Sequence, residues 1–133
     1  MAAHLLVCCN LRQLAIESNH LGQGLRKVTP SGKETVLHSF TGNPDGAYPF
    51  SSTLVFDTKG NVYGTANAGG TSNVGAVFKM TPSGKETVPY SFSGGADGSG
   101  PQAGVVFDKK GNLYGTTDQG GAYGNGTLFK LVP

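Results

Sequence analysis

The stretch Gly60-Asn-Val-Tyr-Gly-Thr65 occurs twice, since it returns as Gly111-Asn-Leu-Tyr-Gly-Thr116. The sequence Thr-Pro-Ser-Gly-Lys-Glu-Thr-Val is repeated without change at 29–36 and 81–88. These copies lie about 51 residues apart, a period found in repeat architectures such as propellers. The chain is therefore a tandem repeat, and its fold has to be inferred from that repeat.

Apolar alternation between turn residues predicts four short strands in each repeat. Gly60 and Gly111 suit the positive φ that a tight hairpin requires. The third strand of each copy is almost entirely apolar, which is typical of a strand covered on both faces. The predicted strands are 25–28, 34–40, 53–56 and 61–65, then 75–80, 86–92, 104–107 and 112–116, and a last one at 126–131.

Four hairpin-linked strands in each repeat predict an all-β fold built from four-stranded antiparallel blades of the β-propeller type. A β-solenoid is the alternative, but its coils are usually shorter and stack in parallel. The local hairpin turns favour the antiparallel blade.

The repeat divides the chain into four parts. Residues 1–23 are interpreted as a degenerate or partial repeat, in which 11–17 form either a strand, the favoured interpretation, or helical turns. Residues 24–75 and 76–125 form two blades, and 126–133 the first strand of a shared third blade. Propellers usually have four to eight blades. We therefore expect self-association, as a dimer of about six blades; a fragment of a longer protein is the alternative.

The second repeat resembles a known family at several points. These are Tyr90-Ser-Phe-Ser-Gly-Gly-Ala-Asp-Gly98, 111–117, Gly120-Gly121 and Gly126-Thr-Leu-Phe-Lys-Leu131. The pattern resembles the bacterial GloVer-type (choice-of-anchor) tandem repeats over about residues 24–133. This resemblance implies propeller-like blades in surface or secreted proteins, and hence an extracellular or cell-surface location. It implies no catalytic motif, and the apolar start of the chain lacks the basic residues of a convincing signal peptide.

Composition excludes several other classes of protein. The net charge is only +2 and the lysines are spread along the chain, so nucleic acid is not an expected partner. No apolar run approaches the roughly 20 residues of a membrane span. Cys8 and Cys9 are adjacent, a spacing that fits neither a metal site nor a disulfide framework, and the three histidines are scattered. We therefore expect no metal and no cofactor.

Candidate ligand contacts lie on the loops. Asp45 and Asp97 occupy the same loop of the two repeats, where a turn-forming role is favoured over binding of calcium or sugar hydroxyls. Tyr48 and Tyr123 have no aromatic equivalent in the other copy. These two tyrosines are the better candidates for exposed ligand contacts.

The residues that do repeat are interpreted as structural. Asp57 and Asp108 begin hairpins, while Tyr63 and Tyr114 are expected to pack between blades rather than to stack on a sugar. The full set of repeated structural positions is Asp57, Gly60, Asn61, Tyr63, Asp108, Gly111, Asn112 and Tyr114.

No arrangement of residues in the sequence points to catalysis. Ser39 and Ser91 occupy equivalent positions but lack the Gly-x-Ser-x-Gly context of a nucleophile elbow. The glycine-rich segment 120–126 lacks the Lys-Ser/Thr of a phosphate loop. We therefore expect a non-enzymatic scaffold or interaction module, with a glycan-binding propeller lectin carrying equivalent sites in each blade as the alternative.

Overall fold

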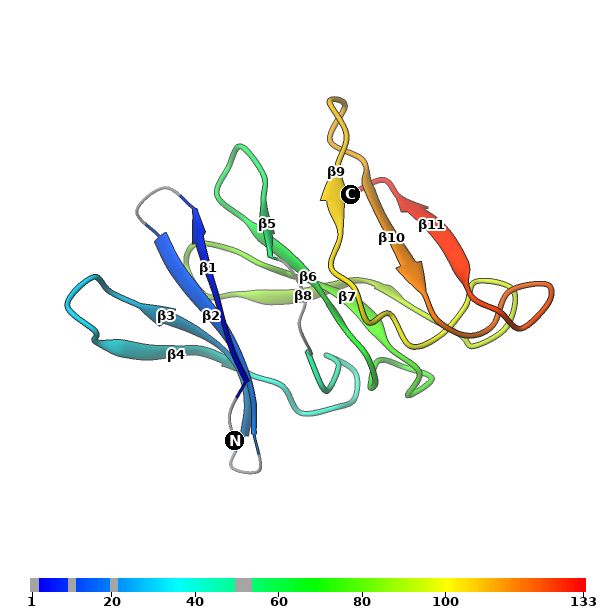
Figure 1. Ribbon diagram of the computed structural model, residues 1–133, viewed down its shortest axis with the longest axis horizontal. Coiled ribbons are helices and arrows are strands. Elements are labelled where there is room, and N and C mark those ends of the chain that lie inside the picture. The colour runs from blue at the N-terminus through cyan, green and yellow to red at the C-terminus, as the bar shows by residue number, and fades with distance from the viewer. Residues whose placement is uncertain (1–2, 10–11, 20–21, 50–53) are drawn as a thin grey trace.

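The computed structural model describes residues 3–9, 12–19, 22–49 and 54–133 (Figure 1). Within these residues all regular structure is β, which confirms the predicted class. The strands are β1 (Ala3–Cys9), β2 (Arg12–Asn19), β3 (Gly22–Val28), β4 (Glu34–Ser39), β5 (Val55–Phe56), β6 (Val62–Ala66), β7 (Ala76–Met80), β8 (Glu86–Ser91), β9 (Val106–Phe107), β10 (Leu113–Thr117) and β11 (Thr127–Leu131).

The strands form three antiparallel sheets, each in simple meander order. Sheet I contains β1-β2-β3-β4, sheet II contains β5-β6-β7-β8, and sheet III contains β9-β10-β11. Hairpin pairing between sequential strands confirms the antiparallel arrangement that the turns predict. In the N-terminal part, β2 shows that the described residues of 11–17 form a strand rather than helical turns.

The sheets do not coincide with the repeats as we divided them in the sequence. Sheet II joins β5 and β6, from 24–75, to β7 and β8, from 76–125. Residues 126–133, expected to begin a shared blade, include β11, which pairs with β10 of the same chain as the third strand of sheet III. The long connection after β4, and again after β8, is where the chain passes to the next sheet.

The apolar third strands are shorter and less covered than the sequence suggests. Among the described residues of these runs, only Val55–Phe56 and Val106–Phe107 lie in strands. Val105 is fully buried, but Val106 is 62% exposed. The expectation of cover on both faces is therefore wrong for this strand, because within the described chain no sheet lies on that side of sheet III.

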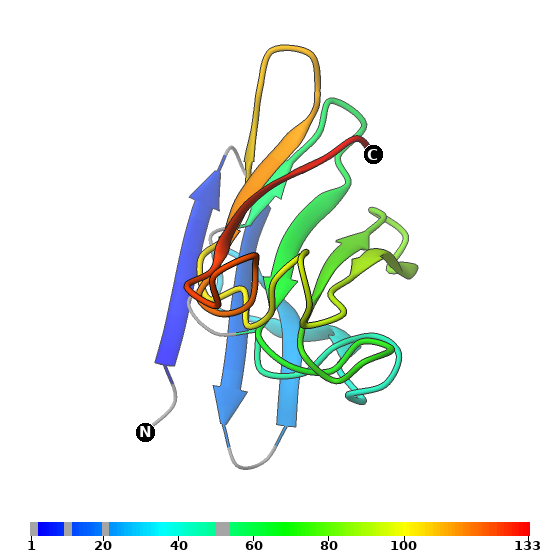
Figure 2. The same cartoon turned by 90° about the vertical axis from the view of Figure 1, so that its right-hand side faces the viewer.

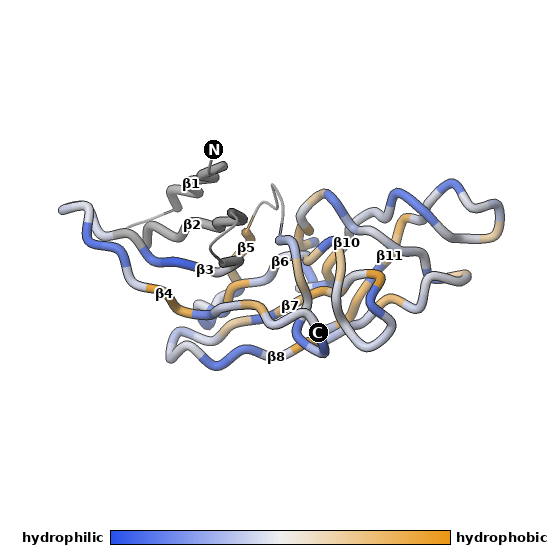
Figure 3. The backbone as a smooth tube through the Cα atoms, turned by 90° about the horizontal axis from the view of Figure 1, so that it is seen from below, coloured by the Kyte–Doolittle hydropathy of each residue, from blue (hydrophilic) through white to orange (hydrophobic). Residues whose placement is uncertain are grey.

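The three sheets stand side by side, with sheet II between the other two (Figures 1 and 2). One hydrophobic cluster, built around Leu25, Phe78 and Met80, fills the space between sheets I and II. A second cluster, which contains Tyr63 and Leu113, joins sheets II and III. The hydropathy colours of Figure 3 place hydrophobic stretches within strands such as β4 and β7. Face-to-face burial of apolar side chains thus holds the stack together.

The second glycine of the repeated motif is required by packing. Gly64 pairs with Phe78 on β7, and a Cβ at Gly64 would lie 2.6 Å from the ring atom Cζ of Phe78. Gly115 pairs with Phe129 in the same way, with a corresponding distance of 2.5 Å. In both sheets the phenylalanine ring therefore lies across a position where only glycine leaves enough room.

Sheets II and III have equivalent faces, one of which is covered by a neighbouring sheet while the other is exposed. We call the forward face of sheet II the side formed by Tyr63, Thr65, Val77 and Lys79, which faces sheet III. The corresponding forward face of sheet III is formed by Val106, Tyr114, Thr116, Leu128 and Lys130. Val77 is 0% exposed, whereas the equivalent Leu128 is 76% exposed. The described chain therefore leaves an apolar sheet face uncovered.

Candidate functional site

The hairpin between β5 and β6 is held by the carboxylate of Asp57. Its Oδ1 accepts hydrogen bonds from the backbone N–H groups of Lys59 and Asn61, both at 2.9 Å. Its Oδ2 accepts one from the side-chain amide of Asn61, at 2.7 Å, and one from the hydroxyl of Tyr63, at 3.3 Å. Gly60 has a φ of 82°, as a tight turn requires. One carboxylate thus ties together the turn and the strand that follows it.

The hairpin between β9 and β10 repeats this arrangement around Asp108. Oδ1 accepts from the backbone N–H groups of Lys110, at 2.8 Å, and Asn112, at 2.9 Å. Oδ2 accepts from the Asn112 amide at 2.8 Å and from the Tyr114 hydroxyl at 3.2 Å. Gly111 has a φ of 83°. The repeated Asp, Gly, Asn and Tyr of the sequence therefore form one hydrogen-bonded unit in each hairpin.

These hydrogen bonds favour the ionised carboxylates. The side-chain amide of Asn112, together with the backbone donors, lowers the pKa of Asp108 from 3.8 to about 2. Burial acts to raise the pKa of Asp57, but the hydrogen bonds from Asn61, Lys59 and Tyr63 outweigh it and hold that pKa below its ordinary value. Both carboxylates are therefore ionised at neutral pH.

Acid should weaken the fold through the second hairpin. Because the pKa of Asp108 is lower in the folded than in the unfolded chain, its contribution to stability is complete above a pH of about 4 and is lost as the pH falls towards about 2. The variant Asp108→Asn lacks this titration, so its unfolding free energy should depend less on pH in that range. Denaturant unfolding of both proteins between those limits measures the difference, and parallel pH profiles would contradict the role of this carboxylate.

Each hairpin tyrosine also contacts a lysine. Tyr63 is 2% exposed and packs edge-on against Phe107 of sheet III, with ring centroids 5.3 Å apart. The Nζ of Lys79 lies 5.6 Å from the centroid of the Tyr63 ring. In sheet III the Nζ of Lys130 lies 5.9 Å from the ring centroid of Tyr114. The ring faces thus hold lysine ammonium groups by cation–π attraction near the hairpin carboxylates.

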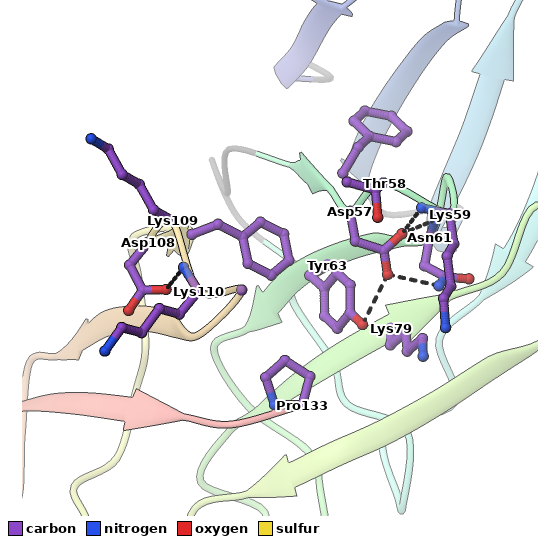
Figure 4. A pocket seen from close by; sticks show the side chains of 13 residues that line it. Asp57, Thr58, Lys59, Asn61, Tyr63, Lys79, Asp108, Lys109, Lys110 and Pro133 are labelled. Carbon is purple, nitrogen blue, oxygen red and sulfur yellow. Dashed lines mark hydrogen bonds between the residues drawn. The ribbon is translucent and has the colours of Figure 1, made fainter.

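A cavity of about 570 Å³ opens between the β5–β6 and β9–β10 hairpins (Figure 4). The two hairpin tips lie next to each other at one end of the stack (Figures 1 and 2). Phe56, Tyr63 and Phe107 contribute its aromatic lining. Four lysines also line it, and we call this cavity the lysine groove; they are Lys59, Lys79, Lys109 and Lys110.

The predicted ligand residues Asp45 and Asp97 are engaged by their own loops. Asp45 is 7% exposed and accepts hydrogen bonds from the backbone N–H and the hydroxyl of Thr41, the latter at 2.7 Å. It also pairs with Nε2 of His38 at 2.9 Å. Asp97 accepts from the Tyr90 hydroxyl at 2.9 Å and from the backbone N–H of Ser93 at 2.8 Å. These contacts fit the favoured turn-forming interpretation of both carboxylates.

The four predicted ligand residues lie on three different loops. Tyr48 is 47% exposed and follows Asp45 on the β4–β5 loop, where its φ is 52°. Tyr123 is 91% exposed on the β10–β11 loop, while Asp97 lies on the β8–β9 loop. Asp97 lines a separate cavity of about 190 Å³ beside β11.

The lysine groove was not predicted from the sequence. Lys59 and Lys110 stand at equivalent places, each directly before the glycine of the repeated motif, and this repetition was the available signal. What the repeat could not reveal is that hairpins of neighbouring sheets lie side by side. Among the described residues, no group of three or more His, Cys, Asp or Glu side chains is arranged to hold a metal ion. The described part of the chain also contains no helix of the length and apolarity of a membrane span.

Comparison with known proteins identifies the repeat. A family model described as the Gloeobacter/Verrucomicrobia repeat matches residues 18–133. This match confirms the resemblance that the repeated motifs indicated, and it covers both hairpin networks. The chain matches no curated protein.

Proposed function

Because the chain belongs to the Gloeobacter/Verrucomicrobia repeat family, we propose that it is a non-enzymatic β-propeller-type module that acts as an assembling scaffold or interaction domain. The single observation that carries this proposal is the exposed forward face of sheet III. That face presents Val106, which is 62% exposed, and Leu128, which is 76% exposed. Large apolar side chains exposed on one sheet face favour a role of that face in protein interaction.

The covering partner in this proposal is a second copy of the chain. Sheet III itself covers the equivalent face of sheet II, through Phe107, Leu113 and Phe129 packed around Tyr63. Another antiparallel meander sheet of this chain is therefore the partner whose shape suits this face. Two chains of three sheets each would place six sheets in a closed ring, within the four to eight blades usual for propellers.

A charge placed on the forward face tests this assembly. Leu128→Glu should weaken association by at least about 100-fold, because an unpaired carboxylate would be buried at the contact. Tyr123→Glu adds the same charge on an exposed loop and should leave association unchanged. Sedimentation equilibrium of both variants measures the effect. Equal association of the two variants would exclude the forward face of sheet III as the contact surface.

Glycan binding at the loops is the second candidate function, favoured by the exposure of Tyr48 and Tyr123, whose rings could stack on sugars. The loss of glycan-array binding in a Tyr48→Ser, Tyr123→Ser variant would support this function. An array without any binding by the unaltered chain would remove it. The extracellular or cell-surface location also belongs to the proposal, and fractionation of producing cells tests it.

A further inference from the structure

We infer that the lysine groove binds a segment of acidic polysaccharide, with carboxylate or sulfate groups held by lysines from two neighbouring sheets. The groove lies within one chain, so this inference does not depend on assembly. Figure 4 shows the side chains of Lys59 and Lys79 on one side of the cavity and those of Lys109 and Lys110 on the other. An extended chain of anions that crosses the groove can reach both sides.

The lysines of the groove are not neutralised by the protein. Within the described residues, none of the four ammonium groups forms an ion pair with a carboxylate; Lys79 lies over the ring of Tyr63. The two side-chain carboxylates that line the groove, those of Asp57 and Asp108, each accept hydrogen bonds within their own hairpin. Four ammonium groups thus face two internally satisfied side-chain carboxylates, and positive charge remains in excess even when the α-carboxylate of Pro133 is counted.

The equivalent position between sheets I and II provides a comparison within the same chain. A cavity of about 280 Å³ lies there, and its lining includes the apolar side chains of Leu25, Leu37 and Met80. Among the described residues that line it, Lys27 is the one lysine. Three of the four lysines of the lysine groove belong to the β5–β6 and β9–β10 hairpins, and these three distinguish it from the smaller cavity. Lys109 stands where the first repeat has Thr58.

The aromatic lining favours a polysaccharide over a nucleic acid. Tyr63 is 2% exposed and Phe56 and Phe107 are partly buried, so they form an apolar floor. Nucleic-acid sites of the single-stranded type depend on exposed rings on which successive bases stack. A sugar chain does not require exposed rings, because its C–H groups can contact the apolar floor while its anionic groups contact the ammonium groups.

Binding of defined oligosaccharides to the full chain tests the inference. The probes are an oligogalacturonate, which carries carboxylates, a heparin oligosaccharide, which carries sulfates, and neutral dextran of similar length. We expect binding of at least one anionic probe, weakened by added salt, and no binding of dextran. The variant Lys59→Gln, Lys110→Gln should bind the anionic probes about 25-fold more weakly. This factor follows from a loss of about fivefold for each lysine, the usual contribution of one lysine to binding of an anionic surface. Titration calorimetry measures these affinities.

A matched variant distinguishes binding at the lysine groove from nonspecific attraction by the net charge of the chain. Lys33→Gln, Lys85→Gln removes two exposed lysines from equivalent turns outside the groove and should change affinity by less than about twofold. Equal weakening by the two double variants would overturn the inference, as would tighter binding of single-stranded DNA than of either acidic oligosaccharide. The Leu128→Glu variant should bind the acidic oligosaccharides with the affinity of the unaltered chain. A loss of assembly can therefore be distinguished from a loss of binding at the lysine groove.

Discussion

Replacing Phe78 by alanine should lower the free energy of unfolding by about 3–5 kcal/mol, the usual cost of removing a buried aromatic ring. Phe78 is fully buried between sheets I and II, and its ring centroid lies 5.0 Å from that of Phe40. The ring also lies across Gly64, where no side chain is available to fill the space it leaves. A domain of this size is stabilised by about 5–15 kcal/mol, so the loss should be plain in denaturant unfolding.

The equivalent residue of sheet III provides the internal comparison. Phe129 is only partly buried, so Phe129→Ala should cost less than Phe78→Ala. Tyr123→Ala, at a position 91% exposed, should change stability by no more than about 0.5 kcal/mol. All variants are compared at one chain concentration, because association would add to apparent stability. Equal losses at Phe78 and Phe129 would show that the interface of sheets I and II is not the main core.

Adding a methyl group at Gly64 should cost about 1–3 kcal/mol, the range for overpacking a filled core. The Cβ of Gly64→Ala would lie 2.6 Å from Cζ of Phe78 and 3.1 Å from a methyl carbon of Leu54. Both neighbours are buried, so neither can move aside without disturbing the cluster. This expectation opposes the ordinary preference for alanine over glycine in a strand interior.

A double variant tests the cause of this loss. Phe78→Leu removes the ring atom that the new methyl group would meet, so Gly64→Ala should cost less in that background. The coupling free energy is expected to be about 1 kcal/mol or more, as for residues in direct contact. Gly95→Ala is the control, since the nearest atom to its Cβ would lie 3.7 Å away. Additive effects at Gly64 and Phe78 would refute the steric explanation of the repeated glycine.

The strands could be predicted from sequence because their residues alternate and their turns carry glycine and proline at fixed places. The division of the strands into sheets could not be predicted, because the sequence does not show which connections join strands of one sheet and which lead to the next sheet. The length of a connection is the best indication of a change of sheet, since the chain passes to the next sheet at the long connection from β4 to β5. The first two strands of sheet I lie in residues 1–23, which do not carry the repeated motif, so periodicity does not reveal them.

The candidate sites show a similar limit. Asp57 and Asp108 could be assigned to hairpins because an aspartate before a tight turn can accept backbone hydrogen bonds. Their link to Tyr63 and Tyr114 could be noticed only once the side chains were placed in space. The lysine groove depends on two hairpins that are distant in sequence and adjacent in the fold. Repetition in the sequence thus identifies the structural unit. A site between two units can be found only when their arrangement in space is known.

The molar mass of the unaltered chain in solution tests the central claim most directly. The chain has a mass of 13.6 kDa, and light scattering after size-exclusion chromatography should give twice that value at micromolar concentration. A dimer that dissociates when Leu128 is replaced by glutamate would agree with cover of the forward face by a second copy. A monodisperse species of 13.6 kDa across a wide range of concentration would contradict the proposed assembly.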